Sequence, residues 1–232
     1  MVVILYAAGG ILLAALFLRL SSKAEATGAG SVTASPVNLL GLGASQRVVF
    51  RLSALFALDS FAGGFVMQSF CAYWFYLRWG VSAESLGVLF FGANLLAGVS
   101  ALVASRLASR IGLVRTMVFT HLPSNVLLIL VPLMPTVPLA MSVLLMRFSI
   151  SQMDVPARQA YTMTVVRPEE RSATAGVTGV ARTLGASVAP VLAGLLFARP
   201  ALISVPFFIA GTLKSVYDLS LYRAFDSHEA EN

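Results

Sequence analysis

Residues 85–105 read SLGVLFFGANLLAGVSALVAS and hold no charged side chain. A helix of about 20 such residues crosses the roughly 30 Å hydrocarbon core of a bilayer. The whole chain shares this character, with 58% hydrophobic and 11% charged residues among 232. Ordinary globular domains carry about 25% charged residues. Because no soluble fold could bury so much apolar surface, the sequence predicts an integral membrane protein.

Seven stretches of this kind are predicted to cross the membrane. They lie near 1–18, 52–76, 84–105, 116–135, 138–160, 173–197 and 200–221. Each is apolar on nearly every face, whereas the strands of a membrane barrel alternate. The predicted fold is therefore an all-α, polytopic transmembrane helical bundle. Its parts are a helix at 1–20, a flexible linker at 21–46, a six-helix block at 47–222 and a tail at 223–232.

Lysine and arginine residues gather on alternate connections, twelve on one side and two on the other. The richer side holds Arg19, Lys23, Arg47, Arg51, Arg106, Arg110, Arg115, Arg158, Arg167, Arg171, Lys214 and Arg223. The positive-inside rule places that side, with the carboxy terminus, in the cytoplasm of a cell whose inner or plasma membrane holds the protein. This topology explains the net charge of +6, so no nucleic-acid partner is predicted.

The same topology puts the amino terminus outside. Residues 1–18 have no leading basic residue and do not form an ordinary signal peptide. These features favour Met1 as the opening of a fragment of a longer protein.

Residues that could carry catalysis or hold a metal are scattered. Cys71 is the single cysteine, and His121 and His228 are isolated from other ligand-type residues in the sequence. Neither a disulfide nor a Cys/His metal framework follows from them. No nucleotide-binding loop or Ser/His/Asp constellation is evident. The sequence therefore predicts no enzyme activity, no catalytic residue, no cofactor and no metal.

Polar side chains inside the spans are the candidate functional residues. A charge at bilayer depth costs at least about 2.5 kcal/mol, so each needs a reason. The candidates are Asp59, Asn94, Asn125, Arg147 and Arg182, which fall near one level of their helices. Two interpretations stay open. The residues form a substrate or ion site at the middle of the membrane, or Asp59 pairs with Arg147 or Arg182 while the asparagines bond across helix interfaces.

Small residues in the sixth span indicate close helix packing. Gly185, Ala189 and Ala193, followed by Gly194, lie at spacings that let two backbones approach. Pro190 in the same span removes a backbone donor and can kink the helix, as can Pro156 near the cytoplasmic end of the fifth span.

One connection resembles a known family signature. The segment SRLASRIGLVRT at 105–116 is similar to the loop Gly-x-Leu-Ala-Asp-Arg-x-Gly-Arg-Arg of the major facilitator superfamily. The matching residues are Leu107, Ala108, Arg110, Gly112 and Arg115, and the departures are Ser105 and Ser109. The resemblance implies that the seven spans correspond to helices six to twelve of a twelve-helix facilitator, with 21–46 as its central loop.

The resemblance also implies roles for particular residues. It places Asp59, Asn94, Arg147 and Arg182 on cavity-lining helices, in the pathway of a substrate or a proton, and leaves Asn125 with a structural role. The segment GASVAPVLAG at 185–194 resembles an antiporter motif and favours export. The segments QMDVPARQAY and VVRPEERSA are similar to the ends of facilitator helices ten and eleven. They offer gating ion pairs among Asp154, Arg158, Glu170 and Arg171, or else a solvated charged rim.

The predicted function is secondary transport of a small solute by alternating access, coupled to protons, with Asp59 as the proton carrier. The expected partners are the solute, H⁺, the lipid bilayer, and either a missing amino-terminal half or a second copy. Two alternatives remain: a seven-span receptor or assembly factor that transports nothing, and a half-size transporter that dimerises.

Overall fold

The computed structural model describes residues 7, 10–11, 14–16, 18 and 40–229. The chain divides into two compact units, 1–37 and 38–232. The described residues of the first unit are all helical. Most of the predicted first span at 1–18 and most of the predicted linker at 21–46 lie outside the described residues.

The second unit is a bundle of helices joined by short turns. Its helices are α2 Gln46–Gly64, α3 Gln68–Trp79, α4 Ala83–Ile111, α5 Leu113–Leu130, α6 Val137–Ser151, α7 Asp154–Thr164, α8 Arg171–Phe197 and α9 Val205–Glu229. Short 3-10 turns lie at η2 Val131–Leu133, η3 Pro168–Glu170 and η4 Pro200–Leu202. All these elements are helical, so the all-α prediction is confirmed. The last helix continues past the predicted start of the tail at 223.

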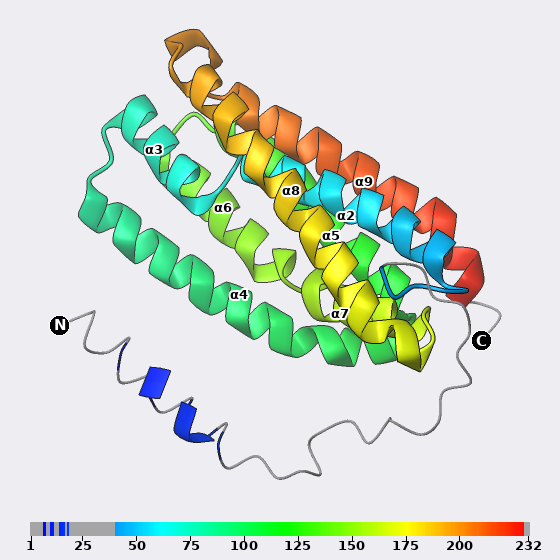
Figure 1. The fold of residues 1–232 in the computed structure, drawn as a ribbon. Coiled ribbons are helices and arrows are strands. Elements are labelled where there is room, and N and C mark those ends of the chain that lie inside the picture. Colours follow the sequence, from blue (N-terminus) through cyan, green and yellow to red (C-terminus); the bar gives the residue numbers. More distant parts are fainter. Residues whose placement is uncertain (1–6, 8–9, 12–13, 17, 19–39, 230–232) are drawn as a thin grey trace. The chain divides into compact units, whose positions relative to one another are not determined.

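Successive helices run up and down, which gives the bundle two ends. The α4–α5 and α7–α8 connections lie at one end, here called the Gly112 end, and the α3–α4 and α8–α9 connections lie at the other, the Gly80 end (Figure 1). Within the described residues, five helical stretches are long and apolar enough to cross a membrane. The α6–α7 pair, at 137–164, runs along the bundle in two shorter pieces.

Two predicted spans are each broken into two helices. The predicted span at 52–76 is interrupted after Gly63 and Gly64, where α2 ends and α3 begins. The span at 138–160 is interrupted between α6 and α7. Pro156 explains the second break because it has no N–H to donate to the carbonyl group of Gln152, four residues earlier. Gly63 and Gly64 explain the first break, because a pair of glycines weakens a helix.

Apolar side chains form two main cores along the bundle. The core toward the Gly80 end includes Trp74, Phe75 and Phe207, and the core toward the Gly112 end includes Phe56 and Tyr217. Helix α2 packs along α8 and α9, and α5 packs along α9 (Figure 1). The stretch of α2, α5 and α9 that lies between the two cores is where the polar residues of the spans gather.

Glycines allow the closest helix contacts. A Cβ atom added to Gly185 of α8 would collide with the carbonyl oxygen of Ala57 on α2. One added to Gly64 would lie 2.7 Å from the Cβ atom of Ala189, so these two helices touch through small residues on both sides. Pro190 lies inside α8, which continues through it. Gly194 has nothing within 4 Å of an added Cβ atom.

Two glycines of one helix provide a matched test of this packing. We expect Gly185→Ala to lower the unfolding temperature of the purified protein in detergent, because overpacking costs roughly 1–3 kcal/mol. Gly194→Ala is the control and should leave that temperature unchanged or raise it, since Ala is favoured over Gly within a helix by about 1 kcal/mol. Equal effects of the two substitutions would contradict the close contact between α2 and α8.

Candidate functional site

Six ionisable side chains from four helices meet inside the bundle and are each less than a tenth exposed. We call them the charge cluster: Asp59 of α2, His121 of α5, Asp154 and Arg158 of α7, and Lys214 and Asp218 of α9. Asp59, His121 and Lys214 lie between positions of their helices that belong to the two apolar cores, and Asp218 lies beside Tyr217 at the edge of the core toward the Gly112 end. The cluster is therefore a polar layer closed by apolar packing on both sides.

Asp59 is the centre of the cluster. Its Oδ1 accepts a hydrogen bond from Lys214 Nζ at 2.5 Å, and its Oδ2 accepts one from Arg158 Nη1 at 2.9 Å. The Nε2 atom of His121 lies 3.9 Å from Oδ1. A buried carboxylate is tolerated when cations and hydrogen bonds satisfy it, and here three other helices supply them.

The second part of the cluster joins α5 to α9. Asp218 Oδ1 lies 2.9 Å from His121 Nδ1, and its Oδ2 accepts a hydrogen bond from Asn125 Nδ2 at 2.7 Å. On α7, Arg158 Nη1 is also 3.5 Å from Asp154. His121 thus lies between two carboxylates, those of Asp59 and Asp218, and its two ring nitrogens face one each.

Helical spacing explains why these groups meet. His121 and Asn125, Asp154 and Arg158, and Lys214 and Asp218 are each four residues apart on their helices. Side chains at this spacing lie on one face of a helix. Each of α5, α7 and α9 therefore presents two polar groups together toward the same layer.

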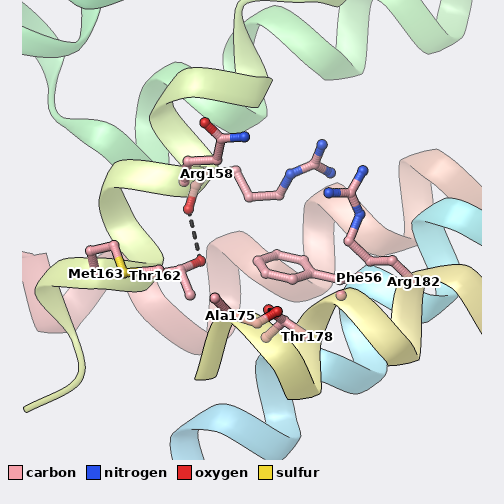
Figure 2. Close-up of a pocket in the computed structure, with 9 residues that line it drawn as sticks. Phe56, Arg158, Thr162, Met163, Ala175, Thr178 and Arg182 are labelled. Carbon is pink, nitrogen blue, oxygen red and sulfur yellow. Dashed lines mark hydrogen bonds between the residues drawn. The ribbon is translucent and has the colours of Figure 1, made fainter. Parts of the chain in front are cut away.

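A pocket opens beside the cluster, between α2, α7 and α8. Its volume is about 180 Å³, and its walls include Phe56, Arg158, Thr162, Thr178 and Arg182. Figure 2 shows both guanidinium groups reaching into this space, with the ring of Phe56 beside them. Arg158 therefore belongs both to the charge cluster and to the pocket wall.

A second hollow lies between α3 and α4. It has a volume of about 460 Å³ and is lined mainly by apolar side chains together with Gln68 and Asn94. Asn94 Nδ2 donates to the carbonyl oxygen of Phe90 at 2.8 Å and approaches Gln68 Oε1 at 3.4 Å. The side chain of Asn94 is exposed on the bundle and takes no part in the charge cluster.

Gly112 makes the turn between α4 and α5. Its φ of 91° lies in the region that favours glycine, and its N–H caps α4 through the carbonyl oxygen of Ala108. Its own carbonyl oxygen accepts hydrogen bonds from the backbone N–H and the hydroxyl group of Thr116, in the first turn of α5. Leu107, Arg110 and Arg115 flank this turn. The glycine of the loop signature is therefore favoured at this position because the turn needs a positive φ angle.

Comparison with protein families decides the identity of the fold. The family model described as Major Facilitator Superfamily matches residues 74–223. The chain belongs to the major facilitator superfamily. The match covers α4 to α8, half of α3 and most of α9, and so includes five of the six residues of the charge cluster. Membership of a family of membrane transporters favours the transporter interpretation over a receptor or an assembly factor.

One relative of this chain is an uncharacterized membrane protein, YJR124C, of Saccharomyces cerevisiae. The two are 28% identical over 175 residues, which is 75% of this chain and 39% of the yeast protein. The chain thus spans well under half the length of the curated relative that it matches. No solved structure gives a significant match.

The four residues predicted for the transport pathway lie in different surroundings. Asp59 is buried in the cluster, but its cations are Arg158 and Lys214, and neither predicted partner contacts it. Arg147 is half-buried, with its guanidinium 5.3 Å from the ring centre of Phe148. Arg182 lines the pocket and approaches Ser60 Oγ at 3.4 Å.

Sequence reasoning assigned three members of the cluster differently. The sequence pattern places Arg158 and Lys214 among the cations of the cytoplasmic connections and the tail and leaves His121 isolated, whereas all three are buried beside Asp59 or Asp218. The carboxylates account for this placement, because a cation in an apolar bundle is stabilised by an acidic partner. The available signals were the four-residue spacings and the position of Lys214 inside the predicted span 200–221.

The proposed gating residues are divided between two places. Asp154 and Arg158 lie together in the cluster. Glu170 instead accepts a hydrogen bond from the backbone N–H of Ser45 at 3.2 Å, and Arg171 Nε donates to the carbonyl oxygen of Met163 at 3.1 Å. Glu170 thus connects the start of α2 to the α7–α8 turn. In the part of the chain that the structure describes, no group of three or more His, Cys, Asp or Glu residues could hold a metal ion.

A double-mutant cycle tests the central ion pair. We expect Asp59→Asn alone to destabilise the protein strongly, by about 3–5 kcal/mol, because it leaves buried cations without their carboxylate. Asp59→Asn combined with Lys214→Met should cost less than the sum of the two single changes, with a coupling free energy within about 0.5–3 kcal/mol. Unfolding in detergent, followed by circular dichroism, measures both. The control combines Glu169→Gln, on the exposed η3 turn, with Lys214→Met, and the changes in the free energy of unfolding should add. Additive changes for Asp59→Asn and Lys214→Met would refute the ion pair.

Proposed function

We propose that this chain is the carboxy-terminal bundle of a secondary transporter that moves a small solute by alternating access and is coupled to protons. The observation that carries the proposal is the charge cluster, buried where α2, α5, α7 and α9 meet. Ionisable groups inside a membrane bundle mark substrate and proton pathways. Burying them costs free energy, and apolar side chains could pack the bundle without that cost.

The formal charge of the cluster supports proton coupling. Its three carboxylates face two permanent cations, Arg158 and Lys214, so with His121 neutral one negative charge remains. One proton restores neutrality. His121 and Asp59, 3.9 Å apart, are the groups that would share it. A buried layer that is balanced only when it holds a proton is suited to gaining and losing that proton as water reaches it from alternate sides.

The interrupted helices support movement in the same region. The α2–α3 and α6–α7 breaks divide the helices that carry Asp59 and Arg158. A few residues at such a break can absorb changes in backbone angle while the packed pieces move as units. The small residues at 185–194, which resemble an antiporter motif, are explained by the close contact of Gly185 with α2. They therefore give no ground for export, and the proposal does not include a direction of transport.

The test is a transport assay on reconstituted protein. Proteoliposomes that hold this chain, or the longest reading frame that contains it, are scanned with pools of small solutes by solid-supported membrane electrophysiology. We expect a solute-evoked current that increases with an inward proton gradient. Asp59→Asn should abolish this increase while leaving solute exchange across the membrane, because the asparagine imitates the neutralised carboxylate.

His121→Gln provides a second variant, since it keeps every carboxylate and permanent cation in place. It should also reduce the dependence on the proton gradient. Glu169→Gln is the control and should behave as the wild type. Wild-type currents that ignore the proton gradient, or full proton dependence in both cluster variants, would refute the coupling.

A further inference from the structure

The pocket between α2, α7 and α8 has an unusual charge. It is lined by Arg158 and Arg182 and by no acidic residue. The two guanidinium groups lie close enough for their charges to repel each other (Figure 2). Two like charges that share a small space are stabilised by an anion between them.

Both arginines have donors available for a ligand. The contacts of Arg158 with Asp59 and Asp154 both use Nη1, and no described residue accepts a hydrogen bond from its Nη2 or Nε. Arg182 uses Nε toward Ser60, and within the described chain its Nη1 and Nη2 have no partner and no carboxylate pairs with it. Guanidinium groups with free planar donors match the oxygen atoms of a carboxylate or a phosphate.

The remaining walls of the pocket set the size and character of the ligand. The hydroxyl groups of Thr162 and Thr178 donate to the carbonyl oxygens of Arg158 and Thr174, so they present acceptors and methyl groups to the space. The ring of Phe56 lies 5.5 Å from Arg158 Cζ and holds that side chain from one side. A volume of about 180 Å³ takes a compact molecule.

We propose that this pocket binds a small organic anion, whose carboxylate or phosphate group bridges Arg158 and Arg182 while its apolar part lies against Phe56. The inference deepens the proposed function, on which it rests for the role of the anion as the transported solute. The binding itself does not depend on transport.

Arg158 connects this site to the charge cluster. An anion that binds its free donors neutralises part of the positive charge that Asp59 faces, so the cluster becomes more negative and holds a proton more readily. By thermodynamic reciprocity, a proton in the cluster strengthens anion binding by the same factor. The charged and titratable groups around Asp59 and His121 are Arg147 from α6, Asp154 and Arg158 from α7, Arg182 from α8, and Lys214, Tyr217 and Asp218 from α9. One anion and one proton would therefore bind together.

Calorimetric titration of the purified chain in detergent tests the binding. The probes are sodium benzoate, its neutral analogue benzamide, and inorganic phosphate. We expect benzoate or phosphate to bind and benzamide to bind at least tenfold more weakly. Arg182→Gln should weaken anion binding at least tenfold, and Arg182→Lys should retain part of it. Arg182 is exposed on α8, so both variants should unfold at the wild-type temperature.

Arg199→Gln is the matched control, an exposed arginine that lies just beyond the end of α8 and outside the pocket, and should bind as the wild type does. The relative affinities for benzoate and inorganic phosphate show whether the site prefers a carboxylate or a phosphate. Failure of the wild type to bind either anion, equal affinity for benzoate and benzamide, or unchanged binding by Arg182→Gln would overturn the site.

Repeating the titration in two buffers with different ionisation enthalpies separates the two proposals. Uptake of about one proton with each anion supports the connection through Arg158. Arg182-dependent anion binding without proton uptake would leave the site in place and refute the coupling. Proton-driven currents without Arg182-dependent binding would leave the proposed function in place and overturn the anion site.

Discussion

The pairing of Asp59 with cations from two other helices is the constraint on which the bundle depends. A carboxylate between two apolar cores has no water to satisfy it, so α7 and α9 must stay where Arg158 and Lys214 reach it. His121 and Asp218 extend the same requirement to α5. Apolar packing alone leaves membrane helices free to rotate or slide against one another, because lipid is as apolar as their side chains. The charge cluster removes that freedom and sets how four helices face one another.

Much of the architecture could be predicted from local signals. Apolar length predicts the spans from α2 onward, and Gly112 marks the turn after α4 because its backbone angle is unfavourable for other residues. Hydropathy alone does not reveal the two helix breaks, since it averages over a window and does not register a missing backbone hydrogen bond. Pro156 and the Gly63–Gly64 pair carried that information in the sequence.

The site was predictable only in part, for a physical reason. Asp59 is conspicuous because a charge within an apolar span stands out, whereas the partner of a buried charge depends on which helices are neighbours. Four-residue spacing places Lys214 and Asp218 on one face of α9, but it does not say that this face meets α2 and α5. Counting Arg158 and Lys214 as loop cations followed the positive-inside rule, which does not distinguish a cation at a helix end from one held by a buried acid.

The exposed faces of the bundle constrain what surrounds it. The outer face of α4 presents Val88, Phe91 and Leu102, which lipid tails can cover. Helix α8 exposes Val180 and Leu184 on one side and Arg182, two residues from each, on the other. An arginine with no acidic partner in the described chain is costly in hydrocarbon. That part of α8 must therefore border water or another protein segment. Arg182 also lines the pocket between α2, α7 and α8. The proposed anion site therefore lies where α8 needs water or another protein segment beside it.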